Sequence, residues 1–322
     1  MKVSPRRRRA GWAEPLFRAG TGAVAVLVIA VVLGILVVLV DDSLLSVRKF
    51  GLSFWRTQTW DLVAGEFGAL PFIWGTLYSS VLALLLAAPM ALGIAVFLAE
   101  LSPRWLRQPL VFLTELLAAI PSIVYGLWGI FVLAPAVRAI ETHTPEWLRR
   151  FPLFSGPPLG VGMLAAALVL AVMVVPFTAT VAREILKAVP VSQREAAYAL
   201  GATRWEAIRL AVHYGRVGII GAVMLGFGRA LGETMAVTMV IGNNPQVSLS
   251  LFAPQHTMAA VIANEFTEAA DALYLNALVE IGLVLFLITI AINALSRLLI
   301  WRVGTLRAGR PPRAAAEVAL AA

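Results

Sequence analysis

The sequence predicts an all-α, polytopic membrane protein with six transmembrane helices and both termini in the cytoplasm. Hydrophobic residues make up 60% of the 322-residue chain and charged residues only 14%, whereas soluble proteins are about half apolar and a quarter charged. Six long segments carry almost no charge, and most Lys and Arg residues fall in alternate connections between them. Buried helices of a soluble core are the alternative, but six such segments with so few charges between them argue against it.

Each of the six segments can supply the ~20 apolar residues that a spanning helix needs. Their ranges are 19–40, 67–99, 108–137, 151–182, 217–264 and 272–296. In the second segment Pro71 is expected at the helix start and Pro89 at a kink, and in the third segment Pro121 is expected to kink the helix.

The orientation follows from the basic residues. With the N-terminus inside, nineteen of the 26 Lys and Arg residues lie in cytoplasmic segments, six lie outside, and Arg229 lies within the membrane. This asymmetry satisfies the positive-inside rule and places both termini in the cytoplasm. A nucleic-acid patch is the alternative interpretation of the arginine run 6–9, but a run beside a first membrane span is typical of topology signals, so no nucleic-acid partner is expected.

Several kinds of chemistry are absent from the sequence. The chain has no Cys, and its three histidines, His143, His213 and His256, fall in three different connections. The lack of Cys and the scattered positions of the histidines argue against a metal site or a catalytic triad. No Gly-Lys-Ser/Thr phosphate loop occurs. We therefore expect no catalytic residues, no metal and no cofactor.

Arg229 and Glu233 are the charged residues of the otherwise apolar segment 217–243. An Arg at mid-bilayer costs about 2.5–3.5 kcal/mol even on permissive scales, so such residues usually mark transport pathways. A continuous helix from near Gly215 would place Arg229 ~20 Å along its axis, near the membrane centre, with Glu233 one turn further on the same face. A purely structural ion pair between two subunits is the alternative.

The predicted cytoplasmic connection 183–216 contains Glu195, Ala196 and Ala197, followed after three residues by Gly201. This pattern resembles the signature loop of permease subunits in ABC importers. The resemblance implies a short helix, stopped by Gly201 in the left-handed conformation, that docks on a partner ATPase. Family members often continue with Ile-x-Leu-Pro, where this chain has Ala211, His213 and Tyr214. An ordinary amphipathic hairpin is the alternative interpretation.

Two further segments, 228–237 and 120–129, resemble permeases of the phosphate-specific (Pst) ABC importer family, and the similarity runs from 71 to 302. It implies the type I importer permease fold, with residues 1–19 as a basic tail, 20–70 as the first span and external segment, 71–302 as the permease core and 303–322 as a second tail. The sister permease PstA is expected to read Gly-Glu-Thr-Ala-Pro, whereas this chain reads Gly-Glu-Thr-Met-Ala at 232–236.

The same resemblance implies import of inorganic phosphate across the inner membrane of a bacterium or archaeon. Arg229 would bind the anion, Glu233 would neutralise Arg229 when the path is empty, and Thr234 would add a hydroxyl. The implied partners are a sister permease, an ATPase dimer that hydrolyses the ATP, an extracytoplasmic phosphate-binding protein, and membrane lipid. The chain itself would not be an enzyme.

Several alternatives remain open at this stage. The substrate could be another oxyanion, such as sulfate or molybdate, or the chain could be the PstA subunit. A secondary anion carrier could use Glu233 as a proton relay, although such carriers usually contain repeats. Glu115 and Glu280 could line the path, or, because they lie near the membrane interface, they could snorkel toward it or cap a helix. The external connection 244–271, with a possible surface helix at 256–269, could contact the binding protein or form a lid.

Overall fold

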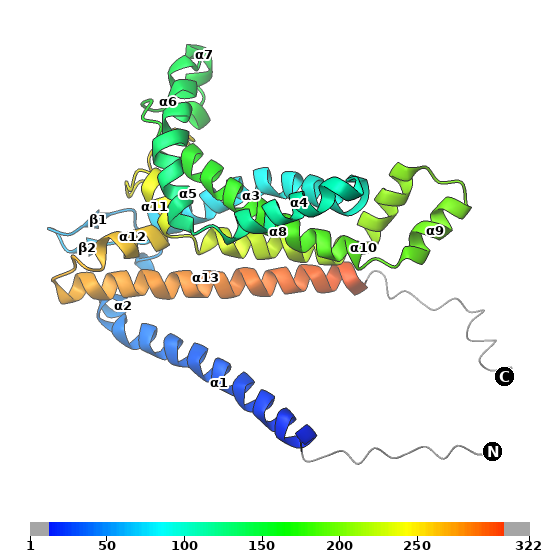
Figure 1. The fold of residues 1–322 in the computed structure, drawn as a ribbon. Helices are drawn as coiled ribbons and strands as arrows, with labels where there is room; N and C mark the ends of the chain where they lie inside the picture. Colours follow the sequence, from blue (N-terminus) through cyan, green and yellow to red (C-terminus); the bar gives the residue numbers. More distant parts are fainter. Residues whose placement is uncertain (1–12, 306–322) are drawn as a thin grey trace.

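A computed structural model describes residues 13–305 of the chain. The long helices at 70–96, 163–187, 204–231 and 272–305 lie side by side along one axis, with the connection that precedes α10 at one end and a small hairpin at the other (Figure 1). The predicted helical fold is confirmed, with one addition: strands β1 and β2 form a short antiparallel sheet, Trp60 facing Phe67 and Asp61 facing Glu66. The predicted tails lie mostly outside the described residues, but α1 already begins at Ala13 and α13 ends at Thr305.

The elements follow one another with short connections. They are α1 (Ala13–Asp42), α2 (Leu44–Phe50), η1 (Gly51–Ser53), β1 (Trp60–Asp61), β2 (Glu66–Phe67), α3 (Leu70–Val96), η2 (Phe97–Leu101), α4 (Arg104–Ala119), α5 (Ser122–Trp128), η3 (Gly129–Leu133), α6 (Ala134–His143), α7 (Glu146–Arg149), η4 (Pro152–Phe154), α8 (Met163–Lys187), α9 (Val191–Ala199), α10 (Arg204–Leu231), α11 (Met235–Val240), α12 (Met258–Glu265) and α13 (Ala272–Thr305).

Within the described chain, six helical stretches are long and apolar enough to cross a membrane, as predicted. Their bounds differ from the sequence prediction at the cytoplasmic connection. Helix α8 continues to Lys187 and α10 already begins at Arg204, so the connection is 188–203 rather than 183–216. The basic residues that marked the loop therefore lie largely on helix ends, where Lys and Arg can extend from an apolar helix toward the interface.

The third predicted span is interrupted. Helix α4 ends at Ala119, Ile120 is extended, and α5 begins after Pro121, so the predicted kink in one continuous helix is wrong. Proline lacks an N–H and disfavours the helical conformation of the residue before it. The hydroxyl of Tyr125 donates to the carbonyl of Leu117 at 2.8 Å and supplies a partner across the break. By contrast, α3 contains Pro71 in its first turn and continues through Pro89.

Helix α8 is the centre of the bundle, because two thirds of its most apolar window is buried by other elements. Helix α3 packs along it through alanines spaced four residues apart. These fully buried residues are Ala83, Ala87, Ala91 and Ala95. Small side chains on one helical stripe let two helices approach closely, which is how membrane helices gain van der Waals contact without a hydrophobic driving force.

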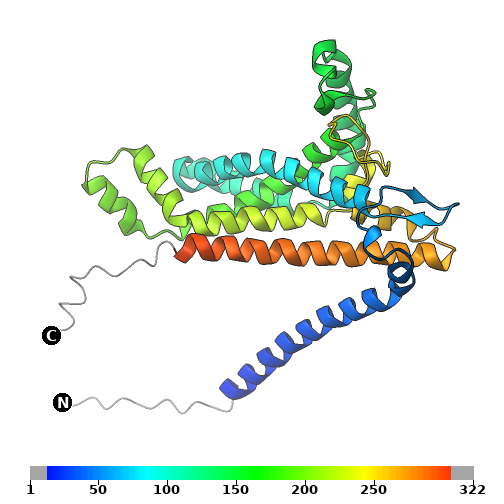
Figure 2. The ribbon, with the colours of Figure 1, turned by 180° about the vertical axis from the view of Figure 1, so that it is seen from behind.

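Helix α1 diverges from the bundle and meets α13 only near its C-terminal end (Figures 1 and 2). None of its most apolar window is buried in the chain. Such a helix, apolar on every side, is stable only in contact with lipid or with another subunit.

A non-helical segment, 241–257, closes the end of the bundle opposite α9. Three backbone carbonyls accept hydrogen bonds from N–H groups at the start of α8, at 2.7–3.2 Å, and so satisfy its free N-terminal donors. The specific pairs are Gly162 to Val240, Met163 to Ala253 and Leu164 to Leu251.

Helix α12 follows this segment and is buried through Met258, Ala260 and Val261. The prediction of a surface helix at 256–269 is therefore wrong: α12 packs on α3 and α13. Glu265, the last residue of α12, accepts hydrogen bonds from the Trp60 indole at 2.9 Å and the Tyr274 hydroxyl at 2.6 Å. These bonds connect the β1–β2 hairpin to α12 and α13.

Candidate functional site

Helix α10 does not continue through the segment that was predicted as one span. It ends at Leu231, residues 232–234 are non-helical, and α11 begins at Met235. The prediction of a continuous helix with Arg229 and Glu233 on one face is therefore wrong. Gly232 is a natural end point, because Gly costs about 1 kcal/mol in a helix interior relative to Ala.

Arg229 lies in the last turn of α10. It is 13 residues beyond Arg216, the preceding charged residue, which corresponds to about 20 Å along the helix. Gly242 lies 13 residues further along the sequence. Its guanidinium carbon lies 5.5 Å from the centre of the Phe177 ring of α8, a cation–π distance. The buried Nε of Arg229 has no hydrogen-bond partner, so the guanidinium retains donors for a ligand.

Glu233 does not neutralise Arg229. None of the four ion pairs among residues 13–305 includes either side chain. Instead, one carboxylate oxygen of Glu233 accepts from the backbone N–H of Ala236 at 3.3 Å, in the first turn of α11. The hydroxyl of Thr234 donates to the carbonyl of Gly232 at 3.4 Å. The three predicted residues thus surround one break, but the predicted Arg–Glu pair is absent from the described residues.

The two helix breaks are neighbours in space, because α5 packs against α11. The contact requires glycine: a Cβ on Gly126 would lie 2.6 Å from the Met239 sulfur and 3.1 Å from the Ala236 Cα. Non-helical backbone at membrane depth is tolerated only where protein buries it or a water-filled cavity adjoins it, and broken helices are how many transporters build substrate sites. Since Gly232 is exposed in the single chain, the break faces a cavity or a partner subunit.

At the other end of α10, α9 forms the short helix predicted for the Glu195–Gly201 pattern. Gly201 has φ +81°, the left-handed conformation expected for a helix stop. Its N–H donates to the Tyr198 carbonyl at 2.9 Å, and the Ala202 N–H donates to the Ala197 carbonyl at 3.0 Å. These two bonds define a Schellman motif, so the predicted geometry of the stop is confirmed.

The outer surface of this helix is available to a partner. Glu195 and Ala196 are exposed, whereas Ala197 is buried against the chain. Around them, large apolar side chains are exposed although no lipid is expected on this side: Val191, Tyr198 and Leu200. Leu200 is 90% exposed. A compact exposed apolar surface of this kind marks a protein contact.

Comparison with known proteins identifies the chain. The model of the family described as "Binding-protein-dependent transport system inner membrane component" matches residues 91–304. The phosphate transport system permease protein PstC of Mesorhizobium japonicum is 46% identical over 302 residues, which cover 92% of each chain. The chain belongs to the PstC family of permeases.

Other relatives, at both similar and lower sequence identity, support this membership. The PstC of Haemophilus influenzae is 47% identical and covers 90% of this chain and 93% of its own, and the probable PstC of Methanocaldococcus jannaschii is 38% identical over 78% and 82%. A solved structure of the MetNI methionine ABC transporter matches with a TM-score of 0.55 at 17% identity, over 72% of this chain and 94% of that one. This match shows the ABC transporter permease fold.

As a PstC-family member, the protein is a multi-pass inner-membrane permease component of a binding-protein-dependent ABC importer, and not an enzyme. An ATPase and a binding protein are therefore its partners. Membership in a binding-protein-dependent family overturns the alternative of a secondary carrier, and the PstC relatives overturn the alternative that the chain is PstA.

Sequence reasoning missed the residue that holds α9 in place in this PstC-family permease. Arg194 donates to Glu100 in η2, which continues directly from α3, through Nε at 3.1 Å and Nη2 at 2.5 Å. It also donates to the carbonyls of Leu186 and Val189, both at 2.9 Å, at the end of α8. Arg204 adds a bond to the Glu100 carbonyl at 2.8 Å. The position next to Glu195 in the signature loop was the signal that could have drawn attention to Arg194.

The structure shows the contacts of two acidic residues, Glu115 and Glu280, whose roles the sequence left open. Glu115 of α4 lies 3.9 Å from the guanidinium of Arg183, a buried residue of α8 that also bonds Glu184 at 2.7 Å. Glu280 of α13 is 3% exposed and lies beside Ser46 of α2. Glu115 thus balances a cation near the cytoplasmic end, and Glu280 is enclosed where α2 meets α13.

Proposed function

We propose that this chain forms one half of the membrane path of a phosphate importer, paired with a homologous sister permease. ATP hydrolysed by a partner dimer drives the path between outward and inward openings, and an extracytoplasmic binding protein delivers phosphate. Both chain termini and α9 lie on the cytoplasmic side, in keeping with the distribution of basic residues. The core of this permease is 71–302, with the first span and its external segment at 20–70.

The observation that carries the proposal is the state of Arg229. Its guanidinium lies beside a break in a membrane helix, rests on the Phe177 ring, and has no carboxylate within 4 Å among the described residues. A guanidinium presents a planar fork of donors that matches two oxygens of phosphate. An unpaired cation in a membrane is costly, so its retention is best explained by an anionic ligand that pairs with it during transport.

Thr234 and Glu233 complete this site on the α11 side of the break. The Thr234 hydroxyl has a long 3.4 Å bond to a backbone carbonyl and is easily redirected to a phosphate oxygen. Glu233 accepts a hydrogen bond from the first turn of α11, so its carboxylate shapes the break. The negative charge of the same carboxylate repels anions that carry no proton to donate. Phosphate at neutral pH does carry such a proton, whereas sulfate and molybdate do not.

The α9 helix gives the chain its contact with the ATPase. Glu195, Ala196, Ala197 and Gly201 form the docking knob, and the exposed apolar side chains around it fill the partner's groove. Because Arg194 ties α9 to the ends of α3 and α8, movement of the ATPase is passed directly to two spanning helices.

Reconstitution tests the proposal. The complete importer, purified in detergent and placed in liposomes with ATP and binding protein, is expected to accumulate radiolabelled phosphate and to exclude radiolabelled sulfate and molybdate. The same vesicles without ATP provide the control. Equal accumulation of sulfate or molybdate would reassign the substrate, and uptake without ATP would contradict the importer mechanism.

A further inference from the structure

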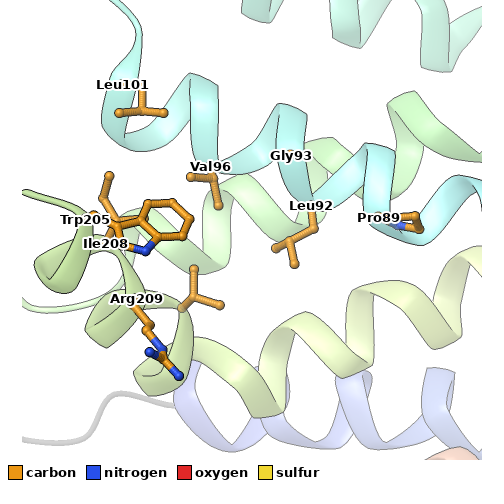
Figure 3. A pocket seen from close by; sticks show the side chains of 9 residues that line it. Pro89, Leu92, Gly93, Val96, Leu101, Trp205, Ile208 and Arg209 are labelled. Atoms are coloured by element: carbon orange, nitrogen blue, oxygen red, sulfur yellow. The ribbon is translucent and has the colours of Figure 1, made fainter.

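A groove opens between α3 and α10 in the half of the bundle nearest α9 (Figure 3). It has a volume of about 660 Å³, within the range of about 300–1,000 Å³ that small-molecule sites occupy. Its walls are apolar apart from Arg209 and the Trp205 indole: Pro89, Leu92, Gly93, Val96 and Leu101 line one side, and Trp205, Ile208, Arg209 and Val212 line the other.

The groove lies on the side of α10 away from the proposed phosphate path. Arg209 and Arg229 are twenty residues apart on α10, and at about 100° per residue they project from faces about 160° apart. The face that carries Arg229 contacts α8 at Phe177, whereas the face that carries Arg209 borders α3. The groove therefore opens away from the path and toward the membrane.

The rim of the groove is basic and aromatic. Arg209 is exposed, and no carboxylate lies within 4 Å of it in the described part of the chain. The nearby Glu206 is engaged elsewhere, because its carboxylate accepts from the Thr203 N–H at 2.7 Å and the Thr203 hydroxyl at 2.8 Å. Trp205 is 67% exposed one turn away on the same helix. Trp and Arg in this arrangement are typical of the headgroup level of a membrane.

We propose that this groove binds an anionic phospholipid of the cytoplasmic leaflet, with one acyl chain between α3 and α10 and the headgroup phosphate at Arg209. The proposal uses the orientation given above, in which the α9 end is cytoplasmic, but not the identity of the transported anion. Charge complementarity selects an anionic lipid, since basic pockets between helices on the cytoplasmic side bind such headgroups. Because the walls move with α3 and α10, a bound lipid would stabilise one arrangement of the helices that connect α9 to the path.

Two substitutions separate the headgroup from the acyl chain. Arg209→Gln removes the charge, and Gly93→Trp fills the groove, because an added Cβ at Gly93 has no heavy atom within 4 Å and the fold has room for it. The matched controls are Arg297→Gln, an exposed cation near the same end of α13, and Gly34→Trp on α1, where an added Cβ is equally unobstructed.

Native mass spectrometry of the intact importer, titrated with phosphatidylglycerol or phosphatidylethanolamine, tests the proposal. The parent complex is expected to prefer phosphatidylglycerol, and Arg209→Gln is expected to reduce that preference about fivefold, the ratio equivalent to about 1 kcal/mol for one basic residue at an anionic surface. Gly93→Trp should remove the most tightly held lipid of either kind, and both controls should match the parent.

Lipid binding that is unchanged by both variants would overturn the proposal. Occupation of the groove by a helix of the sister permease would also overturn the proposal. Cross-linking from a single introduced cysteine detects this outcome, because the chain contains no other cysteine. Val212→Cys should form no cross-link to the sister subunit if lipid fills the groove. Phosphate uptake is measured in parallel. If Arg229→Gln loses uptake completely but keeps the lipid preference, the phosphate path and the lipid groove are separate sites, and each proposal can fail without the other.

Discussion

Two arginines near opposite ends of the α9–α11 region have opposite surroundings. Arg194 donates to a carboxylate and to two helix-terminal carbonyls at 2.5–3.1 Å, and it holds α9, α8 and α3 as one unit. Arg229 has a buried Nε without an acceptor, and its guanidinium carbon lies 5.5 Å from the centre of the Phe177 ring. The same type of side chain thus fixes a helix where each of its three nitrogens donates, and is a candidate binding group where its Nε has no acceptor.

Under the proposed roles, the contrast corresponds to a division between a coupling element and a substrate site. A coupling element must transmit force, so its polar groups are paired within the chain and bend little. A substrate site must exchange its ligand, so its polar groups are left available and the backbone around them is broken into short segments. Experiments that remove donors from each arginine in turn test this division.

The largest effect is expected from Arg229→Gln. Phosphate uptake should fall at least about thirtyfold, because loss of a buried, hydrogen-bonded charge partner costs an anion about 2–5 kcal/mol or more. Arg229→Lys should restore part of the uptake, since Lys keeps the charge but lacks the fork. Uptake in cells is measured together with co-purification of the ATPase. Normal uptake would exclude a role in the path, and loss of assembly would favour the structural ion pair instead.

Arg194→Gln is expected to come next. It leaves the Glu100 carboxylate, 14% exposed, without its cation, and breaking a buried pair costs about 3–5 kcal/mol before allowance for partial solvent screening. Stimulation of ATPase activity by binding protein and phosphate should decline about tenfold while phosphate binding persists.

The double variant Arg194→Gln/Glu100→Gln provides the matched test for that pair. It should recover part of the stimulation, because no unpaired charge remains, and the cycle measures the coupling between the two residues. Lys187→Gln, which breaks only a solvent-exposed pair with Glu184, should behave like the parent. Additive losses in the cycle would show that Arg194 acts without Glu100.

Gly201 tests the helix stop by conformation alone, because an added Cβ meets no atom within 4 Å. Gly201→Ala forces a side chain into the left-handed region at a cost of about 1–2 kcal/mol, so ATPase stimulation should fall severalfold. Gly201→Asn should stay close to the parent, since Asn tolerates this region. Glu195→Lys changes the docking surface without changing the stop and should weaken ATPase co-purification. If Ala and Asn variants behave alike, the left-handed residue is not what positions the knob.

His256 reports on the closed external end. It is 2% exposed, its Nδ1 accepts from the Thr257 N–H at 3.1 Å, and burial lowers its pKa to about 4. Because the unfolded state binds this proton below about pH 6.5 and the folded state only below about 4, stability should fall as pH drops through this window, by about 2 kcal/mol at pH 5.

The melting temperature of the detergent-solubilised importer at pH 7.5 and pH 5 measures this effect. His256→Gln should reduce the difference between the two pH values, whereas His143→Gln, at an exposed position, should leave it as in the parent. An unaltered pH dependence in His256→Gln would show that water reaches this end of the bundle.

The smallest effect is expected from Glu233→Gln. If Glu233 serves mainly to accept from the Ala236 N–H, Gln retains an oxygen for that bond and uptake should change less than threefold. Glu233→Ala removes the acceptor and should cost about 1 kcal/mol at the start of α11, as loss of a helix cap does. A large loss in Glu233→Gln, measured as uptake at saturating phosphate, would show that its negative charge acts on Arg229 after all.

The sequence by itself determined the class of protein, the six spans and the coupling motif. These features depend on local quantities: apolar segments of spanning length, the positions of Lys and Arg, and a Gly separated by three residues from Glu-Ala-Ala. Gly201 could be assigned a left-handed stop because its conformation is decided within one turn of α9. The importance of Arg229 also followed locally, from the cost of a guanidinium in an apolar segment.

Only the tertiary structure decided how these parts are connected. Beyond the break at 232–234, α11 packs closely on α5 at Gly126, and α9 is anchored through Glu100, which is 94 residues away in sequence from Arg194. The spacing of Arg229 and Glu233 suggested an ion pair, because four residues correspond to one turn of an unbroken helix. Whether a membrane helix stays unbroken depends on the neighbours that accept its freed backbone groups, and those neighbours come from distant parts of the chain.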